Sequence, residues 1–169
     1  MNALLLYAAM LLGMMPEGWT LYYEQSRGLD AYVYERGDER ILAIQGTKTM
    51  GDLVAIPVRR LFGYSDRYLK IARVLDVDLV IGHSAGGGMA SWVAYELGVP
   101  SVTFNAAAPT EQALLNDGAQ QTNVVVTGDR WGDPANTQAS LAGTYVYLPP
   151  APEGVRSHPM TTVFEILGN

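Results

Sequence analysis

A serine among glycines and other small residues is the strongest chemical feature of this sequence. Ser84 lies in the sequence Gly-His-Ser-Ala-Gly at residues 82–86, after the apolar run at residues 79–81 and before an amphipathic segment. This is the pattern G-x-S-x-G between a strand and a helix, where small neighbours permit the sharp turn that exposes the serine. The N–H groups at the start of the following helix suit a developing oxyanion. We therefore predict that Ser84 is a nucleophile.

A serine hydroxyl needs a base to act as a nucleophile, and the sequence contains two histidines, His83 and His158. His83 adjoins Ser84, and neighbouring side chains at a strand end point to opposite sides, so we expect His83 to support the turn. His158 precedes Pro159, which favours the first position of a helix. We therefore place His158 at or near a helix N-cap, where the positive helix end keeps its ring neutral. We predict that His158 is the base, and the alternative is an exposed surface histidine.

The base needs a carboxylate that fixes its tautomer and stabilises its charged form. Asp129 and Asp133 follow the valine-rich run at residues 123–127 and lie on either side of Trp131. Asp129 is nearer to the end of the predicted strand, where its position is better fixed, so we favour it as the acid. Asp133 is the alternative acid. Both aspartates also suit simple turns, because Gly-Asp and Asp-Pro pairs are common there.

An oxyanion hole needs two converging N–H donors. The backbone N–H of Ala85, at the start of the predicted helix, is one candidate. The second candidate is Thr47, which follows the apolar strand over residues 40–45 and offers both an N–H and a hydroxyl. A Gly-Thr pair after a strand is also an ordinary turn, so the pattern alone leaves this role open.

The elements that must position these residues alternate along the chain. We predict strands over residues 20–25, 30–36, 40–45, 78–82, 101–105, 123–127 and 145–148, and helices over residues 2–15, 64–75, 85–97, 110–118 and about 160–168. Strands that alternate with helices from the third strand onward predict a compact α/β fold with a mostly parallel sheet and helices on both faces. In such sheets the chemistry gathers at the carboxyl ends of the strands. The four candidates that follow a predicted strand are Thr47, Ser84, Asp129 and His158.

Composition limits the classes of function. The length of 169 residues suits a single domain, which we place over residues 1–169. The net charge of −6 argues against a nucleic-acid partner. The absence of cysteine excludes disulfides and cysteine metal sites, and two histidines make a histidine-rich metal site unexpected. We therefore expect no metal site built from cysteines or from several histidines.

The first fifteen residues are strongly apolar. They are too few to span a bilayer as a straight helix, and they lack the basic start and clear cleavage site of a secretory signal. We expect a buried or half-buried first helix that ends at Pro16 and Gly18. This favours a cytoplasmic protein without a signal peptide or transmembrane span, and the alternative is an export signal or membrane-surface anchor.

Five segments, in chain order, resemble signatures of the class 3 (fungal-type) lipase family. Residues 44–47 (Ile-Gln-Gly-Thr) are similar to its strand end A-x-R-G-T, residues 82–87 to its serine turn G-H-S-L-G-G, and residues 103–106 (Thr-Phe-Asn-Ala) to its strand T-F-G-x-P. Residues 128–131 lie where that family has its acid motif D-x-V-P, and residues 157–160 resemble its histidine segment. The resemblance covers most of the chain and is greatest to short bacterial or phage-like members.

This resemblance implies a trimmed α/β-hydrolase fold, hydrolysis of carboxylic esters and no metal or organic cofactor. The roles it implies are Ser84 as nucleophile, His158 as base, Asp129 as acid, and Thr47 with Ala85 as oxyanion hole. The sequence departs from the family pattern at Gln45, which replaces an arginine, and in the acid motif, which leaves Asp133 as an alternative to Asp129. The chain is also shorter than a typical member.

The segment over residues 48–63 is apolar and broken by Pro57, next to the predicted site. It suits either a lid that opens over an acyl chain or a packed connection. We expect a serine ester hydrolase that acts on lipid or other acyl esters through an acyl-enzyme, with transient contact to a lipid interface. The alternatives are an acyltransferase, a hydrolase of non-lipid esters or amides, and a non-catalytic binding domain of the same fold.

Overall fold

A seven-stranded sheet forms the centre of the protein in a computed structural model that describes residues 2–47, 58–107, 120–137 and 141–169. The strands lie in the sheet in chain order: β1 (Thr20–Gln25), β2 (Ala31–Arg36), β3 (Glu39–Ile44), β4 (Leu79–His83), β5 (Ser101–Phe104), β6 (Gln121–Val126) and β7 (Thr144–Leu148). The described helices are α1 (Ala3–Leu11), α3 (Val58–Val74), α4 (Ala85–Leu97) and α5 (Met160–Gly168).

The sheet is parallel where the candidate residues are attached to it. Strands β3 to β7 pair in parallel, whereas β1 and β2 form an antiparallel extension at one edge. The carboxyl ends of β3, β4, β5 and β6 therefore meet at one end of the sheet. This arrangement confirms the mostly parallel α/β sheet predicted from the sequence.

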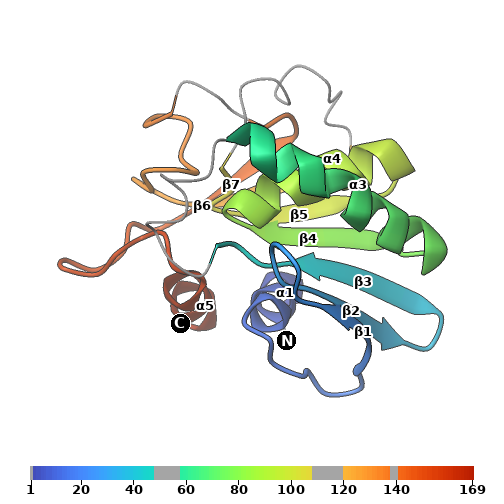
Figure 1. Cartoon of the computed structure of the whole chain (residues 1–169). Coiled ribbons are helices and arrows are strands. Elements are labelled where there is room, and N and C mark those ends of the chain that lie inside the picture. Colours follow the sequence, from blue (N-terminus) through green and yellow to red (C-terminus); the bar gives the residue numbers. More distant parts are fainter. Residues whose placement is uncertain (1, 48–57, 108–119, 138–140) are drawn as a thin grey trace.

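Helices cover both faces of the sheet (Figure 1). Helices α3 and α4 pack on one face over a core that includes Leu42 and Val80, and α1 and α5 pack on the other face over Ile41 and Ile81. Successive strand residues contribute to opposite faces because side chains alternate along a strand. Helices α3 and α4 connect neighbouring parallel strands in chain order, and right-handed connections of this kind all lie on the same face of a sheet. The other face is therefore left for α1 and α5.

Glycine ends two of the helices. Gly13 has φ 75°, and its N–H donates to the carbonyl of Met10 at 2.9 Å, so α1 ends at Leu11 and not near residue 15. Gly98 has φ 72° and ends α4 as predicted. Helix α3 begins at Val58, six residues before the predicted start, and thus includes the end of the 48–63 segment.

Two predicted segments cannot be compared with the structure. Residues 48–57 of the predicted lid and the helix predicted over residues 110–118 lie outside the described residues. Among the helices that the structure describes, none combines the length and the apolar character needed to cross a membrane.

Candidate active site

The turn that carries Ser84 connects β4 directly to α4. Ser84 has φ 55° and ψ −125°, a left-handed conformation that costs about 1–3 kcal/mol for a residue other than glycine. Backbone hydrogen bonds hold it there: its N–H donates to the carbonyl of Phe104 at 3.1 Å, and its carbonyl accepts from Gly87 at 2.9 Å and Ala107 at 3.0 Å. Neighbouring backbone thus stabilises a turn that its own dihedral angles disfavour.

The glycines on both sides of Ser84 are required by close backbone packing. A Cβ atom on Gly82 would lie 2.2 Å from the carbonyl oxygen of Gly86. A Cβ atom on Gly86 would lie 2.4 Å from the carbonyl oxygens of Ile44 and Gln45. No side chain fits at either position, so the small residues of the motif let the start of α4 pack against the ends of β3 and β4.

Ser84, His158 and Asp129 form a continuous hydrogen-bonded series. The Nε2 atom of His158 lies 2.8 Å from the Oγ atom of Ser84, and its Nδ1 atom lies 3.1 Å from each carboxylate oxygen of Asp129. All three side chains are buried. When Nδ1 carries its proton toward the carboxylate, Nε2 is free to accept the proton of the Ser84 hydroxyl. The structure thus brings together three residues from three separate loops.

Asp129 is held by donors on both of its oxygens. Its Oδ1 accepts from the backbone N–H of Trp131 at 3.1 Å and of Gly132 at 2.7 Å, and its Oδ2 accepts from the hydroxyl of Ser157 at 3.2 Å. Burial raises the pKa of this carboxyl, but the hydrogen bond and charge of His158 and the two backbone donors outweigh burial, so the pKa lies below its usual value. Asp129 is therefore charged at neutral pH.

Asp133 lies elsewhere in the same loop. Its Oδ2 accepts from the backbone N–H of Gly128 at 2.8 Å, and its Oδ1 accepts from that of Ala135 at 2.9 Å. Both oxygens are thus used to stabilise the turn. Of the two aspartates that the sequence left as alternatives, the structure places Asp129 against His158.

The two predicted oxyanion donors, Ala85 and Thr47, belong to different parts of the fold. Ala85 is the first residue of α4, so its N–H belongs to the open N-terminal end of the helix. A Cβ atom on Gly46 would lie 3.0 Å from the Cβ atom of Ser84. The backbone beyond β3 therefore touches the serine turn, and Thr47 is the next residue along it.

His83 supports the candidate base through the backbone. Its Nε2 atom lies 2.8 Å from the carbonyl oxygen of His158, which can only accept, so Nε2 carries the proton. Burial, and then the neighbouring His158 ring, lower the pKa of His83 to about 4. His158 itself precedes Pro159, which is the N-cap of α5, so the candidate base lies one residue before the cap.

Asn105 is a site residue that the sequence did not single out. Its Nδ2 donates to the carbonyls of Ser157 at 2.9 Å and His158 at 3.4 Å, and its Oδ1 accepts from the N–H of Val126 at 2.9 Å. The side chain thus ties the segment of the base to the strand that leads to the acid. A polar residue at the end of a predicted buried strand is the signal that points to it, and its φ of 42° shows a tight turn there.

The arrangement supplies the groups needed for acyl transfer through serine: a hydroxyl, an imidazole and a charged carboxylate in hydrogen-bonding order. Metal chemistry would need a different set of side chains. Within the part of the chain that the structure describes, no three histidine, aspartate or glutamate side chains lie close enough to hold a metal ion.

Comparisons with known proteins point to phospholipases. The model of a phospholipase-like family, the Tle-like phospholipase domain, matches residues 8–127. An extracellular phospholipase A1 of Serratia liquefaciens is 33% identical over 101 residues, which are 54% of this chain and 31% of that protein. The chain thus corresponds to about a third of that relative's length.

The matched segment contains the serine turn but ends before the candidate acid and base. The predicted relationship to lipases is confirmed at the level of a phospholipase-like family, while membership of the class 3 lipases stays a prediction. Because the family model matches well over half of the residues, the chain belongs to the Tle-like phospholipase domain family.

Proposed function

We propose that this protein hydrolyses carboxylic esters of lipids through an acyl-enzyme on Ser84. The observation that carries the proposal is the hydrogen-bonded series from Ser84 through His158 to Asp129 at the carboxyl end of the parallel sheet. The family match and the Serratia phospholipase A1 support a phospholipid as the ester. We propose further that the chain forms one domain and works without a cofactor.

The mechanism follows from the positions of the donors and acceptors. The Oγ atom of Ser84 attacks the acyl carbonyl carbon while Nε2 of His158 takes the hydroxyl proton, and Asp129 stabilises the resulting imidazolium. The backbone N–H groups of Ala85 and Thr47 stabilise the oxyanion. His158 then gives its proton to the leaving alcohol oxygen, which releases the alcohol. Water attacks the acyl-enzyme with His158 again as base, and Ser84 regains its proton as the fatty acid leaves.

The rigidity of the site favours catalysis over a purely structural role. The series needs a base whose position does not change as charge develops. Two side chains, His83 and Asn105, donate to the carbonyl oxygen of His158 and fix its backbone. Three further donors fix the carboxylate of Asp129 independently of the base. A lid over the site, formed by residues 48–63, is a further part of the proposal.

The proposal is tested by replacing the nucleophile. Ser84→Ala should abolish labelling by a fluorophosphonate probe and lower the turnover of phosphatidylcholine and p-nitrophenyl butyrate by about 10³-fold or more. The matched control is Thr161→Ala, which removes an exposed hydroxyl from α5 and should leave labelling and turnover unchanged. Persistent labelling of the Ser84→Ala protein, or no turnover of either ester by the wild-type protein, would contradict the proposal.

A further inference from the structure

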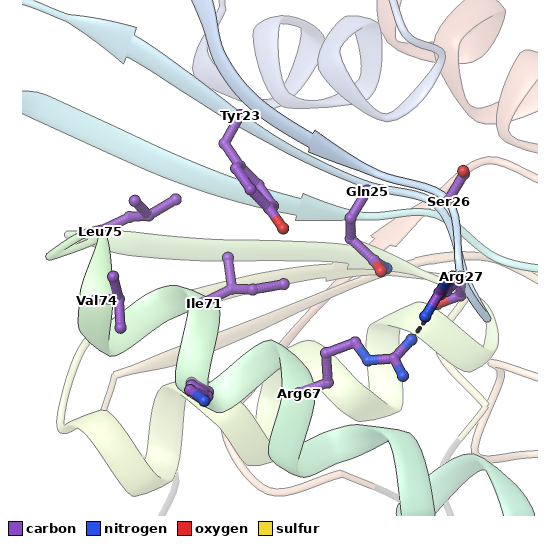
Figure 2. A pocket seen from close by; sticks show the side chains of 9 residues that line it. Tyr23, Gln25, Ser26, Arg27, Arg67, Ile71, Val74 and Leu75 are labelled. Atoms are coloured by element: carbon purple, nitrogen blue, oxygen red, sulfur yellow. Dashed lines mark hydrogen bonds between the residues drawn. The ribbon is translucent and has the colours of Figure 1, made fainter.

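Strand β1 and helix α3 border a cavity that shares no residue with the candidate active site. Its volume is about 620 Å³. Figure 2 shows Tyr23 and Gln25 of β1 pointing toward the helix, and Ile71 of α3 pointing toward the strand. We call this cavity the β1–α3 groove; its lining residues are Tyr23, Gln25, Ser26, Arg27, Arg67, Lys70, Ile71, Val74 and Leu75.

The groove is cationic. Arg27, Arg67 and Lys70 line it, and no acidic residue is among its lining residues. Arg67 donates to the backbone carbonyl of Arg27 at 3.2 Å, which links the helix to the loop after β1 (Figure 2). Arg27 and Lys70 are exposed, and among the described residues their side chains have no ion-pair or hydrogen-bond partner. Two cationic side chains are thus available to an external anion.

This positive charge contrasts with the rest of the protein. The whole chain has a net charge of −6, yet α3 contains five of its eleven lysines and arginines and a single acidic residue. An anionic surface would therefore repel most of the molecule and attract the side that carries α3. Such charge asymmetry selects one orientation at a charged surface.

Apolar side chains lie beside these cations. Val74 is 72% exposed and Tyr23 is 39% exposed, and both line the groove. The opposite side of α3 packs on the sheet through Tyr68, Leu69 and Ala72, so the exposed apolar residues do not belong to the core. Lysine and arginine next to exposed aliphatic and aromatic side chains are typical of helices that lie at a membrane interface. A small free anion would gain nothing from the apolar residues.

We propose that the β1–α3 groove docks the protein on an anionic phospholipid surface. Arg27 and Lys70 contact headgroup phosphates, and Tyr23 and Val74 lie at the boundary between headgroups and acyl chains. The choice of a lipid surface over other anionic partners rests on the proposed lipid-ester hydrolysis, whereas the need for an anionic partner rests on the charge of the groove.

The docking surface is connected to the candidate active site through the backbone. The loop between β1 and β2, which contains Arg27, also contains Asp30, whose carbonyl accepts from the N–H of Gln45 at 2.8 Å. Gln45 precedes Gly46, which contacts the serine turn. A bilayer held at this loop therefore lies next to the strand end that borders Ser84.

The test measures binding to vesicles in the absence of hydrolysis. The Ser84→Ala protein should bind vesicles of phosphatidylcholine with phosphatidylglycerol, and bind vesicles of phosphatidylcholine alone far more weakly, in a sedimentation assay. Adding Arg27→Gln and Lys70→Gln should weaken binding to the anionic vesicles about 30-fold, because each cation near such a surface contributes roughly fivefold. The control is Arg130→Gln with Arg156→Gln, two exposed arginines outside the groove that give the same change in net charge.

Each outcome bears on one proposal only. Equal binding to both kinds of vesicle, or equal weakening by the control pair, would overturn the docking surface while ester hydrolysis stands. Vesicle binding as expected, together with a wild-type protein that hydrolyses no ester, would overturn the proposed function alone. If Arg27→Gln with Lys70→Gln changes the mass of the protein in sedimentation equilibrium but not its binding to vesicles, the docking surface is also overturned. That result would show instead that the groove contacts a second copy of the chain. Thermal unfolding of each variant checks that the fold is intact.

Discussion

Replacing Asp129 by asparagine should invert the hydrogen bonding of the candidate base. Oδ1 of Asp129 accepts from the backbone N–H groups of Trp131 and Gly132, so the amide oxygen of the variant must occupy that position. The amide NH₂ group then takes the place of Oδ2. There it faces the hydroxyl of Ser157 and Nδ1 of His158, which both donated to Oδ2. Nδ1 also lies 3.1 Å from the Oδ1 position, but the oxygen there already accepts from two backbone N–H groups.

The size of the effect follows from the tautomer that this exchange imposes. An NH₂ group only donates, so Nδ1 of His158 becomes an acceptor and the ring proton moves to Nε2. Nε2 lies 2.8 Å from the Oγ atom of Ser84, and a protonated Nε2 cannot take the serine proton. The same change in serine proteases lowers kcat about 10⁴-fold. We expect a loss of that order for Asp129→Asn, or about 5 kcal/mol of transition-state stabilisation.

The assay is steady-state hydrolysis of p-nitrophenyl butyrate, with thermal unfolding as the test of folding. The matched control is Asp133→Asn, because each oxygen of Asp133 accepts one backbone N–H and neither faces His158. Asparagine keeps only one acceptor oxygen, so this control loses one of the two hydrogen bonds. It should therefore lose about 1 kcal/mol of stability and keep its turnover. The reasoning is refuted if folded Asp133→Asn is inactive while Asp129→Asn retains more than about a tenth of wild-type kcat.

Three further predictions concern the residues around the series. Gly86→Ala should lower the melting temperature and turnover together, because its Cβ would overlap backbone oxygens at 2.4 Å and overpacking costs about 1–3 kcal/mol; Gly168→Ala, whose Cβ meets nothing within 4 Å, should do neither. The pKa of His83 is about 4 in the folded protein and 6.5 in the unfolded chain, so the unfolded chain takes up a proton first as the pH falls. The free energy of unfolding should therefore decrease by about 2 kcal/mol between pH 7.5 and pH 5. Urea unfolding of His83→Gln should lack this loss, and an equal loss would contradict the assignment. Asn105→Ala should reduce kcat with little change in KM, since it loosens the segment of the base; a change in KM alone would argue for a substrate contact.

Much of the sheet was predictable because its signals are local. The valines of residues 124–126 are buried in β6, and β1 has the bounds predicted for it. The serine turn was also predictable, since the steric demand on Gly82 comes from Gly86, within a few residues of Ser84. These features depend on short-range periodicity and turn chemistry, which a single sequence displays directly.

Other features depend on contacts between distant parts of the chain. Asp129 and Asp133 have equally good turn chemistry, and the difference between them is the proximity of His158, 29 residues further on. Arg27 and Arg67 are 40 residues apart and meet only because α3 packs beside the edge of the sheet.

The pairing of the first and last helices has a consequence for the order of folding. Met10 of α1 and Val163 of α5 belong to the same buried cluster, on the face of the sheet opposite α3 and α4. During synthesis α1 emerges before the sheet, but its packing partner α5 follows all seven strands along the chain. The face of the sheet that α5 covers thus remains open to water until this helix has emerged, and exposed apolar strands at that stage promote aggregation. The nascent chain should therefore depend on chaperones most strongly just before α5 leaves the ribosome.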